Sequence, residues 1–212
     1  MKEIAIYGAG GFGREIACLI NQINELKQQW KMIGFFDDDP EMKDNRYGEV
    51  LGDFTRLNEW DEPLSLAIAI ADPSNLQKVV SRITNPNIQF PNIIAPNVNI
   101  FDRNAFSIGR GNLVFLGCRL SCDVIIGDFN LFNGAVSLGH DVKLGSYNVL
   151  QPSVRISGDC EVGSNNFFGV HAIVLQGVKI GNNTRVGTQS VVIRNTKDGV
   201  SYFGNPARKM KL

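Results

Sequence analysis

The chain has 212 residues, 43% of them apolar, and its 21 lysines and arginines are balanced by 21 aspartates and glutamates. Because there is no basic stripe or polybasic segment, the composition argues against nucleic acid and against a membrane surface as partners. No apolar run approaches the ~20 residues that cross a bilayer, and the N-terminus has no secretory pattern, so we expect a soluble, cytoplasmic protein with no membrane insertion.

Residues 1–90 are predicted to form an α/β domain with a small parallel sheet. The apolar strand 3–7 leads through a glycine-rich turn into a helix with one apolar face. That face includes Ile16, Leu19, Ile20 and Ile23. A strand at 32–40 ends in acids, and a strand at 64–70 is followed by a helix at 72–83 whose first two residues, Asp and Pro, suit a helix start. Strands that alternate with helices favour a parallel sheet, here about half of a doubly wound fold.

The turn at 8–13 reads GAGGFG and matches the G-x-G-x-x-G pattern. Glycines in such a loop let backbone N–H groups approach a phosphate, helped by the positive end of the following helix. Asp37, at the end of the second strand, stands where a ribose-binding acid is expected. Three interpretations are open: binding of NAD, binding of a mononucleotide, which suits the small sheet better, and a tight turn that binds no ligand.

The rest of the chain is repetitive. From Ile108 to Val192 every sixth residue is apolar, fifteen in succession. A period of eighteen is superimposed on it, and it repeats a glycine and, three residues later, a polar residue. The glycines are Gly109, Gly127, Gly145, Gly163 and Gly181, and the polar residues are Asn112, Asn130, Asn148, Asn166 and Thr184. Period six excludes an ordinary α-helix, so residues 91–212 are predicted to form a parallel β-helix with about five regular coils of three hexads each.

The repeated glycines and asparagines are each predicted to have a structural role in the coils. We interpret the glycines as corner residues that adopt an unusual backbone conformation. Identical residues one turn apart stack at the ~4.8 Å spacing between strands, so the asparagine amides are expected to hydrogen-bond along a ladder.

The pair His140–Asp141 is the main candidate for chemistry, because the chain has only two histidines. His140 follows the core position Leu138 by two residues, so we expect it at a coil face or corner, outside the packed interior. Histidine, with an unperturbed pKa near ~6.5, suits the removal of a proton from an attacking amine or hydroxyl, and a neighbouring carboxylate can fix its tautomer. The alternative is a solvated or structural histidine. Two isolated histidines give no convincing metal site.

Asn133, seven residues before His140, also has two interpretations. Its amide can hold the acceptor or polarise the reacting carbonyl, or it can fill a corner of the coil. No serine or cysteine lies in a nucleophile motif, so direct transfer without an acyl-enzyme is the simpler mechanism.

The chain as a whole resembles a known group of enzymes. Its hexads are similar to those of the hexapeptide-repeat acyltransferases. The ordered motifs YGAGGFGRE, GFFDDDP, VLGD, HD and FGNPARKM resemble the bacterial acetyltransferases of nucleotide-linked amino sugars and the related sialic acid O-acetyltransferases. The resemblance implies a left-handed β-helix, a homotrimer, acetyl-CoA as co-substrate, and transfer of its acetyl group to a nucleotide-linked amino sugar.

The same resemblance implies roles for individual residues. His140 matches the general base, with Asp141 and Asn133 as catalytic partners. Contacts to the nucleotide sugar are expected from Gly10, Gly11, Asp37 and Asp38. Contacts to acetyl-CoA, in a groove between subunits, are expected from Gly158, Val170 and Thr188. His171 is a further candidate cofactor contact, and Arg208 or Lys209 either meets the cofactor phosphates or belongs to a solvated basic tail.

Two departures from the group's motifs lie near the expected acceptor. Ala71–Asp72 replaces a Gly-Asn pair, and Ala95 replaces a histidine at the entry to the β-helix, so the nucleotide and the sugar stay open. Two alternative functions also stay open: O-acetylation of sialic acid or another sugar hydroxyl by the same residues, and a non-catalytic scaffold that binds nucleotide sugars. The intact pair His140–Asp141 argues against the scaffold.

Overall fold

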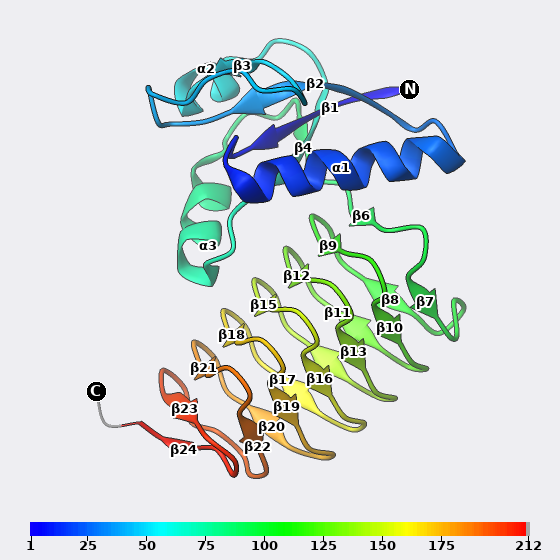
Figure 1. The fold of residues 1–212 in the computed structure, drawn as a ribbon, viewed down its shortest axis with the longest axis vertical. Helices are drawn as coiled ribbons and strands as arrows, with labels where there is room; N and C mark the ends of the chain where they lie inside the picture. Colours follow the sequence, from blue (N-terminus) through cyan, green and yellow to red (C-terminus); the bar gives the residue numbers. More distant parts are fainter. Residues whose placement is uncertain (211–212) are drawn as a thin grey trace.

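The structure is a computed structural model that describes residues 1–210. An α/β module stands at one end of a solenoid, whose coils stack away from it towards the C-terminus (Figure 1). The elements of the module are β1 (Lys2–Tyr7), α1 (Gly11–Leu26), β2 (Trp30–Phe36), β3 (Val50–Gly52), α2 (Phe54–Asn58), β4 (Leu64–Ile68), α3 (Pro73–Arg82) and β5 (Ile88–Gln89). The five strands run parallel in the order β3-β2-β1-β4-β5.

The predicted strands and helices of the module are present. The predicted apolar face of α1 is buried, and the Asp72 carboxylate caps α3 by accepting a hydrogen bond from the Asn75 N–H at 3.1 Å. The edge strands β3 and β5 were missing from the prediction, because three and two residues give no readable alternation. The proposed domain boundary between residues 90 and 91 falls between β5 and the first solenoid strand. Residues 211–212 of the second proposed domain lie outside the described residues.

The solenoid has three faces, each a sheet of very short strands. Face A contains β6 (Ile93–Ile94), β9 (Leu113–Val114), β12 (Leu131–Phe132), β15 (Val149–Leu150), β18 (Phe167–Phe168), β21 (Arg185–Val186), β23 (Ser201–Phe203) and β24 (Arg208–Lys209). Face B contains β7 (Asn99–Ile100), β10 (Arg119–Leu120), β13 (Ser137–Leu138), β16 (Arg155–Ile156), β19 (Ile173–Val174) and β22 (Val191–Val192). Face C contains β8 (Ser107–Ile108), β11 (Ile125–Ile126), β14 (Lys143–Leu144), β17 (Glu161–Val162) and β20 (Lys179–Ile180).

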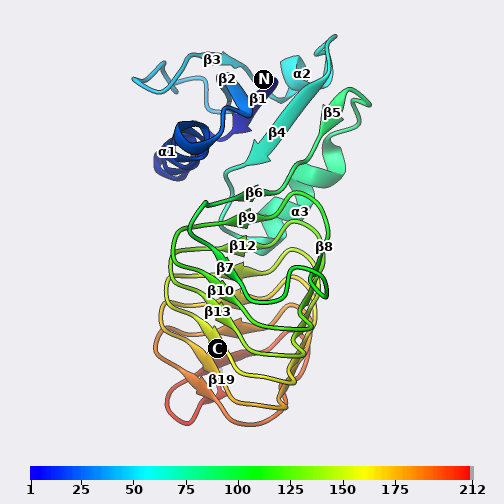
Figure 2. The same cartoon turned by 90° about the vertical axis from the view of Figure 1, so that its right-hand side faces the viewer.

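The chain passes through faces A, B and C in turn, and the fifteen strands from β8 to β22 make the five coils that the hexad count predicts. Figure 2 shows the strands of one face stacked above one another. In strands β8 to β22 the second residue is the apolar residue of its hexad. These side chains are buried in every hexad after the first, for example Val114, Leu120 and Ile126. The predicted parallel β-solenoid is therefore confirmed.

The predicted asparagine ladder is present and fully buried. Asn130 donates its backbone N–H to the Asn112 side-chain oxygen at 2.8 Å and its side-chain amide to the same atom at 3.0 Å. The pattern continues through Asn148 and Asn166 to Thr184, whose N–H donates to Asn166 Oδ1 at 2.7 Å. The ladder also has an earlier member, Asn92, which accepts from the Asn112 amide at 3.0 Å. Asn92 was not predicted, because it precedes Asn112 by twenty residues and not by eighteen.

The interpretation of the repeated glycines as corners with an unusual backbone was wrong. Every sixth residue from Gly111 to Gln189 has a positive φ, between 52° and 76°, but the repeated glycines lie two residues before these positions. A Cβ on Gly145 would lie 2.7 Å from the carbonyl oxygen of Gly163, one coil further on. Glycine is therefore required by the close approach of successive coils.

Those glycines also make room for a second polar ladder. A Cβ on Gly127 would lie 2.6 Å from the Ser146 hydroxyl, which accepts a hydrogen bond from the Asp128 N–H at 2.9 Å. The same bond recurs from Ser146 to Ser164 at 3.0 Å and from Ser164 to Asn182 at 2.8 Å. Each coil is thus joined to the next by short polar side chains at the corner between faces C and A.

The module packs against face A. Phe12, in the first turn of α1, stacks on Phe115 of the solenoid with ring centroids 5.8 Å apart. Leu113 and Leu131, on face A, are buried in one apolar cluster with Ile16 of α1. An ion pair between Asp72 and Arg185, 3.4 Å apart, joins the start of α3 to strand β21.

Replacing Gly145 with alanine tests the close approach of the coils. Because the new methyl group has no space against Gly163, we expect the free energy of unfolding in urea to fall by about 1–3 kcal/mol. Gly134→Ala is the matched control, since a Cβ there lies 3.8 Å from its nearest neighbour, the Leu116 carbonyl oxygen, and φ is not positive. Equal stability of the two variants would contradict the steric explanation.

Candidate active site

The pair His140–Asp141 lies at the corner between faces B and C, directly after β13. Asp141 has a φ of 58°, a left-handed conformation that aspartate tolerates better than most residues. Its carboxylate oxygen Oδ2 lies 2.7 Å from His140 Nδ1. The side chains are 50% and 59% exposed, so the histidine is outside the packed interior, as expected. Nδ1 is engaged by the carboxylate, and Nε2 forms no hydrogen bond within residues 1–210.

Gly158 lies under the imidazole ring. It occupies the position of His140 in the next coil, and a Cβ on it would lie 2.6 Å from His140 Cε1. The carbonyl oxygen of His140 accepts a hydrogen bond from the Asp159 N–H at 2.8 Å, which fixes the backbone of one coil on the other. Because Gly158 has no side chain, the imidazole ring of His140 can lie directly against its backbone. The contact of Gly158 to a cofactor stays a prediction.

The other predicted catalytic and cofactor residues lie at a different corner. Asn133, Val170 and Thr188 follow β12, β18 and β21, at the corner between faces A and B. Asn133 Oδ1 accepts the N–H of Gly134 at 2.8 Å, which is a corner-shaping contact. His171 is exposed at the same corner, with a φ of 58°. Within one chain, face B therefore separates these residues from His140.

The glycine loop combines two structural glycines with two open ones. Gly8 has a φ of 105°, and a Cβ on Gly13 would collide with the Gly8 carbonyl oxygen, so both shape the turn. A Cβ on Gly10 would meet nothing within 4 Å, and one on Gly11 only Arg14 at 3.9 Å. Gly10 caps α1 without a side chain, and the first turn has no acid. The first N–H groups of α1 can therefore meet an anion.

The two predicted substrate-binding acids each hold part of the module together. Asp37 Oδ2 accepts the N–H of Ala9 at 2.7 Å, which ties the end of β2 to the glycine loop. Asp38 accepts from the Tyr7 hydroxyl at 2.7 Å and from the Phe54 N–H at 2.9 Å. Burial, followed by this bond to Asp38, raises the pKa of Tyr7 above its usual range. Tyr7 was missed in the sequence, because its partner Asp38 follows 31 residues later and no local pattern records the contact.

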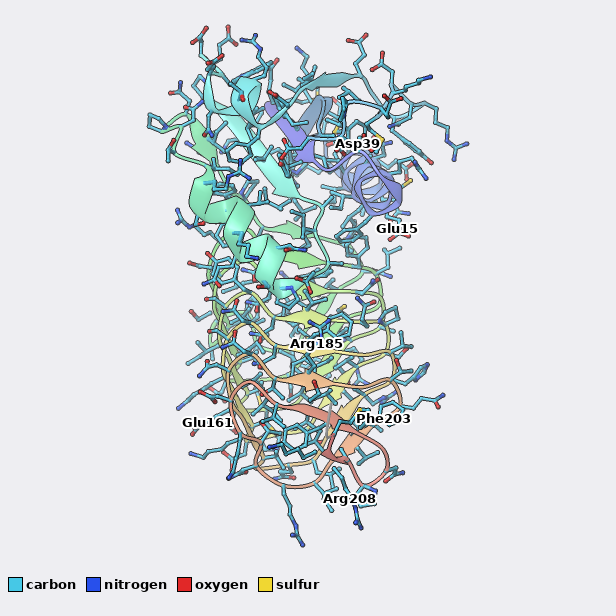
Figure 3. The ribbon with its side chains drawn as sticks, turned by 90° about the vertical axis from the view of Figure 1, so that its left-hand side faces the viewer. Glu15, Asp39, Glu161, Arg185, Phe203 and Arg208 are labelled. Atoms are coloured by element: carbon cyan, nitrogen blue, oxygen red, sulfur yellow. The ribbon has the colours of Figure 1, made fainter. Side chains whose placement is uncertain are left out.

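The two departures in the motifs have local explanations. Asp72 caps α3 and pairs with Arg185, so it belongs to the junction between module and solenoid. Ala95 is 2% exposed in the first coil, where its N–H donates to the Val114 carbonyl at 2.8 Å. The basic tail residues Arg208 and Lys209 are exposed on β24, and Figure 3 shows Arg208 at the end of the solenoid far from the module.

Among residues 1–210, no three His, Cys, Asp or Glu side chains gather where they could ligate a metal ion. None of the described helices has the length and apolar character that a membrane span needs.

The N-terminal module matches a known protein family. Residues 3–83 match the family model of the PglD N-terminal domain. No curated protein matches the sequence.

Three of the solved structures that match along the whole chain illustrate the similarity. PerB from Caulobacter crescentus, in complex with CoA and GDP-perosamine, is 28% identical with a TM-score of 0.84, covering 100% of this chain and 98% of that one. A histidine-to-asparagine mutant of perosamine N-acetyltransferase from the same organism, with the same two ligands, is 27% identical over the same shares, with a TM-score of 0.86. WeeI from Acinetobacter baumannii is 26% identical with a TM-score of 0.88, covering 99% of this chain and 100% of that one.

These matches confirm the predicted resemblance. The chain has the fold and the domain order of the hexapeptide-repeat sugar acetyltransferases.

Replacing Gly158 with alanine tests whether this glycine positions the histidine. The added methyl group would overlap the His140 ring and force it to turn, so we expect kcat for acetyl transfer to fall by about 10²-fold. The thermal unfolding curve and the affinity for acetyl-CoA report separately on fold and cofactor. Ser107→Ala, on face C, is the control and should leave kcat unchanged. Full activity of Gly158→Ala would contradict the positioning role.

Proposed function

We propose that the chain transfers the acetyl group of acetyl-CoA to the amino group of a nucleotide-linked amino sugar, with His140 as general base. The observation that carries the proposal is the 2.7 Å contact between His140 Nδ1 and Asp141 Oδ2 on an exposed corner of the solenoid. It is supported by full-length similarity to PerB, whose structure holds CoA and GDP-perosamine.

The proposed chemistry uses the second ring nitrogen of His140, Nε2, and the charge of the Asp141 carboxylate. Acetyl-CoA supplies the acetyl group as a thioester. His140 Nε2 accepts the proton that the acceptor nitrogen loses as it bonds to the acetyl carbon, and the Asp141 carboxylate stabilises the resulting imidazolium. The imidazolium returns the proton to the sulfur as the carbon–sulfur bond breaks. The products are an amide and free CoA, and His140 is neutral again, so no acyl-enzyme is needed.

We further propose that a second copy completes the site, in a homotrimer. His140 and Gly158 occupy one edge of face B, and Asn133, Val170 and Thr188 occupy the other. One chain cannot join its own two edges, but in a closed ring one edge of each copy meets the opposite edge of the next. Acetyl-CoA then lies between them, along Gly158 on one side and Val170 and Thr188 on the other, with Asn133 near the reacting carbonyl.

The module is proposed to hold the nucleotide. The space around Gly10 and Gly11 and the uncapped start of α1 suit the phosphates of a nucleotide sugar. Asp37 and Asp38 line the adjoining strand end, where Asp37 also fixes the loop through Ala9. Among the three interpretations of the loop, binding of a mononucleotide fits the small sheet, and the GDP-perosamine bound to PerB supports a nucleotide sugar as the ligand that carries it.

Release of free CoA, measured with a panel of UDP-, dTDP- and GDP-linked 4-amino sugars and with sialic acid, tests the proposed function. We expect one amino sugar to be turned over, and His140→Ala to lower kcat by about 10²–10⁴-fold because the base is lost. Asp141→Asn is expected to lower kcat less, because it keeps the shape but not the charge.

Other outcomes would contradict the proposal in different ways. Turnover of sialic acid alone would establish O-acetylation. Nucleotide-sugar binding without acetyl-CoA binding or turnover would establish a scaffold. An active His140→Ala variant with unchanged circular dichroism and mass would exclude this histidine as the base.

A further inference from the structure

A groove of about 270 Å³ lies on face B beside the candidate active site. Its lining includes Phe101, Arg119, Ser121, Ser137, Arg155 and Ser157. Arg119 and Arg155 are paired in register with Ser137 from either side. Their Cα atoms are therefore two strand spacings apart, ~9.6 Å. The long side chains of both arginines can reach one ligand above Ser137.

The two guanidinium groups have no counter-charge on this face. Neither forms an ion pair within residues 1–210, and the strands of face B, from β7 to β22, contain no aspartate or glutamate. Arg119 lies over the Phe101 ring, with its Cζ 5.5 Å from the centroid, which restrains it. Face C differs, since its Lys179 pairs with Glu161 at 3.0 Å. The groove is thus a cationic site with serine hydroxyls between its charges.

Face B also exposes apolar side chains, as a surface that another molecule covers does. Beyond the groove its outward residues become apolar, and Leu175 and Ile193 at its edge are 42% and 43% exposed. The face is bounded on one side by His140 and on the other by Asn133 and Thr188, the two edges that the proposed trimer joins. In that trimer, face B of each copy turns towards the symmetry axis. Guanidinium groups from three copies then approach one another away from bulk water, which is costly without an anion.

We propose that Arg119 and Arg155 of the three copies bind a multivalent oxyanion, of the phosphate or diphosphate type, shared at the trimer axis. The inference rests on the homotrimer of the proposed function. Guanidinium groups bind phosphate oxygens through two parallel hydrogen bonds, and the Ser137 hydroxyl lies between the arginines to donate a further one. The site holds the copies together and is separate from the acetyl-transfer chemistry.

Inorganic pyrophosphate and inorganic phosphate are the probes, added to the full chain at constant ionic strength. Native mass spectrometry is expected to show trimers that carry one pyrophosphate per three chains. The apparent Tm of the wild type should rise by several degrees with pyrophosphate, because the ligand binds only the assembled state. Arg155→Gln and Arg119→Gln should lose at least half of this rise, and the control Lys143→Gln, on face C, should keep it.

The order of stability without the anion gives a second, independent readout. In chloride alone, Arg155→Gln is expected to have a higher Tm than the wild type, because it removes like charges at the axis; with pyrophosphate the order reverses. One pyrophosphate per chain, or equal Tm shifts in wild type and both variants, would overturn the shared site. A raised KM of Arg155→Gln for the nucleotide sugar would show that the groove takes the acceptor's own diphosphate instead.

The same measurements separate this inference from the proposed function. A trimer that binds no pyrophosphate overturns the anion site alone. A monomeric mass overturns both the trimer and the shared site, while CoA release with the amino-sugar panel reports on acetyl transfer independently.

Discussion

The close stacking of the coils is the constraint on which the rest of the structure depends. Successive coils are joined as hydrogen-bonded parallel strands, and at that distance a Cβ on Gly145 would meet the backbone of Gly163. The repeated glycines, the buried asparagines and the short polar side chains beside the glycines all satisfy this one requirement. Because the coils between residues 107 and 192 have the same path, residues eighteen apart form columns there, and the position of a side chain on the solenoid follows from its place in the period.

The same regularity positions the candidate chemistry. Every corner from Gly111 to Gln189 has one residue with positive φ, and at the corner after β13 this residue is Asp141. Its backbone conformation brings the carboxylate to His140 Nδ1, while Gly158 in the next coil leaves space for the ring. The candidates Asn133, Val170 and Thr188 lie at the corner between faces A and B. Face B therefore lies between them and His140, and one chain does not bring the two groups together. Association of copies through the edges of face B provides the missing half in the function proposed above.

Much of the architecture could be predicted from the sequence, because the period of six and the asparagine repeat are direct consequences of burial and hydrogen bonding along the solenoid. The reason for the repeated glycines could not be predicted. A close approach of two backbones and a left-handed backbone both favour glycine, and only the coordinates show which of the two applies. The true left-handed positions are occupied by residues as different as Phe129, Ala135 and Asp141, so they carry no common letter. Asp37, Asp38 and the His140–Asp141 pair were found from motifs. Tyr7 and the groove between Arg119 and Arg155 depend on contacts between residues far apart in the chain, which no local pattern records.

The shared active site is tested most directly by complementation between two inactive variants. Chains with His140→Ala and chains with Thr188→Trp, which blocks the opposite edge of face B, would be produced separately and together with different affinity tags, and mixed assemblies isolated through both tags. Each variant alone should be inactive. We expect the mixed assemblies to recover acetyl transfer, because some interfaces combine the intact His140 of one copy with the intact Thr188 of its neighbour. Mixed assemblies that form but stay inactive would contradict a site built from two copies.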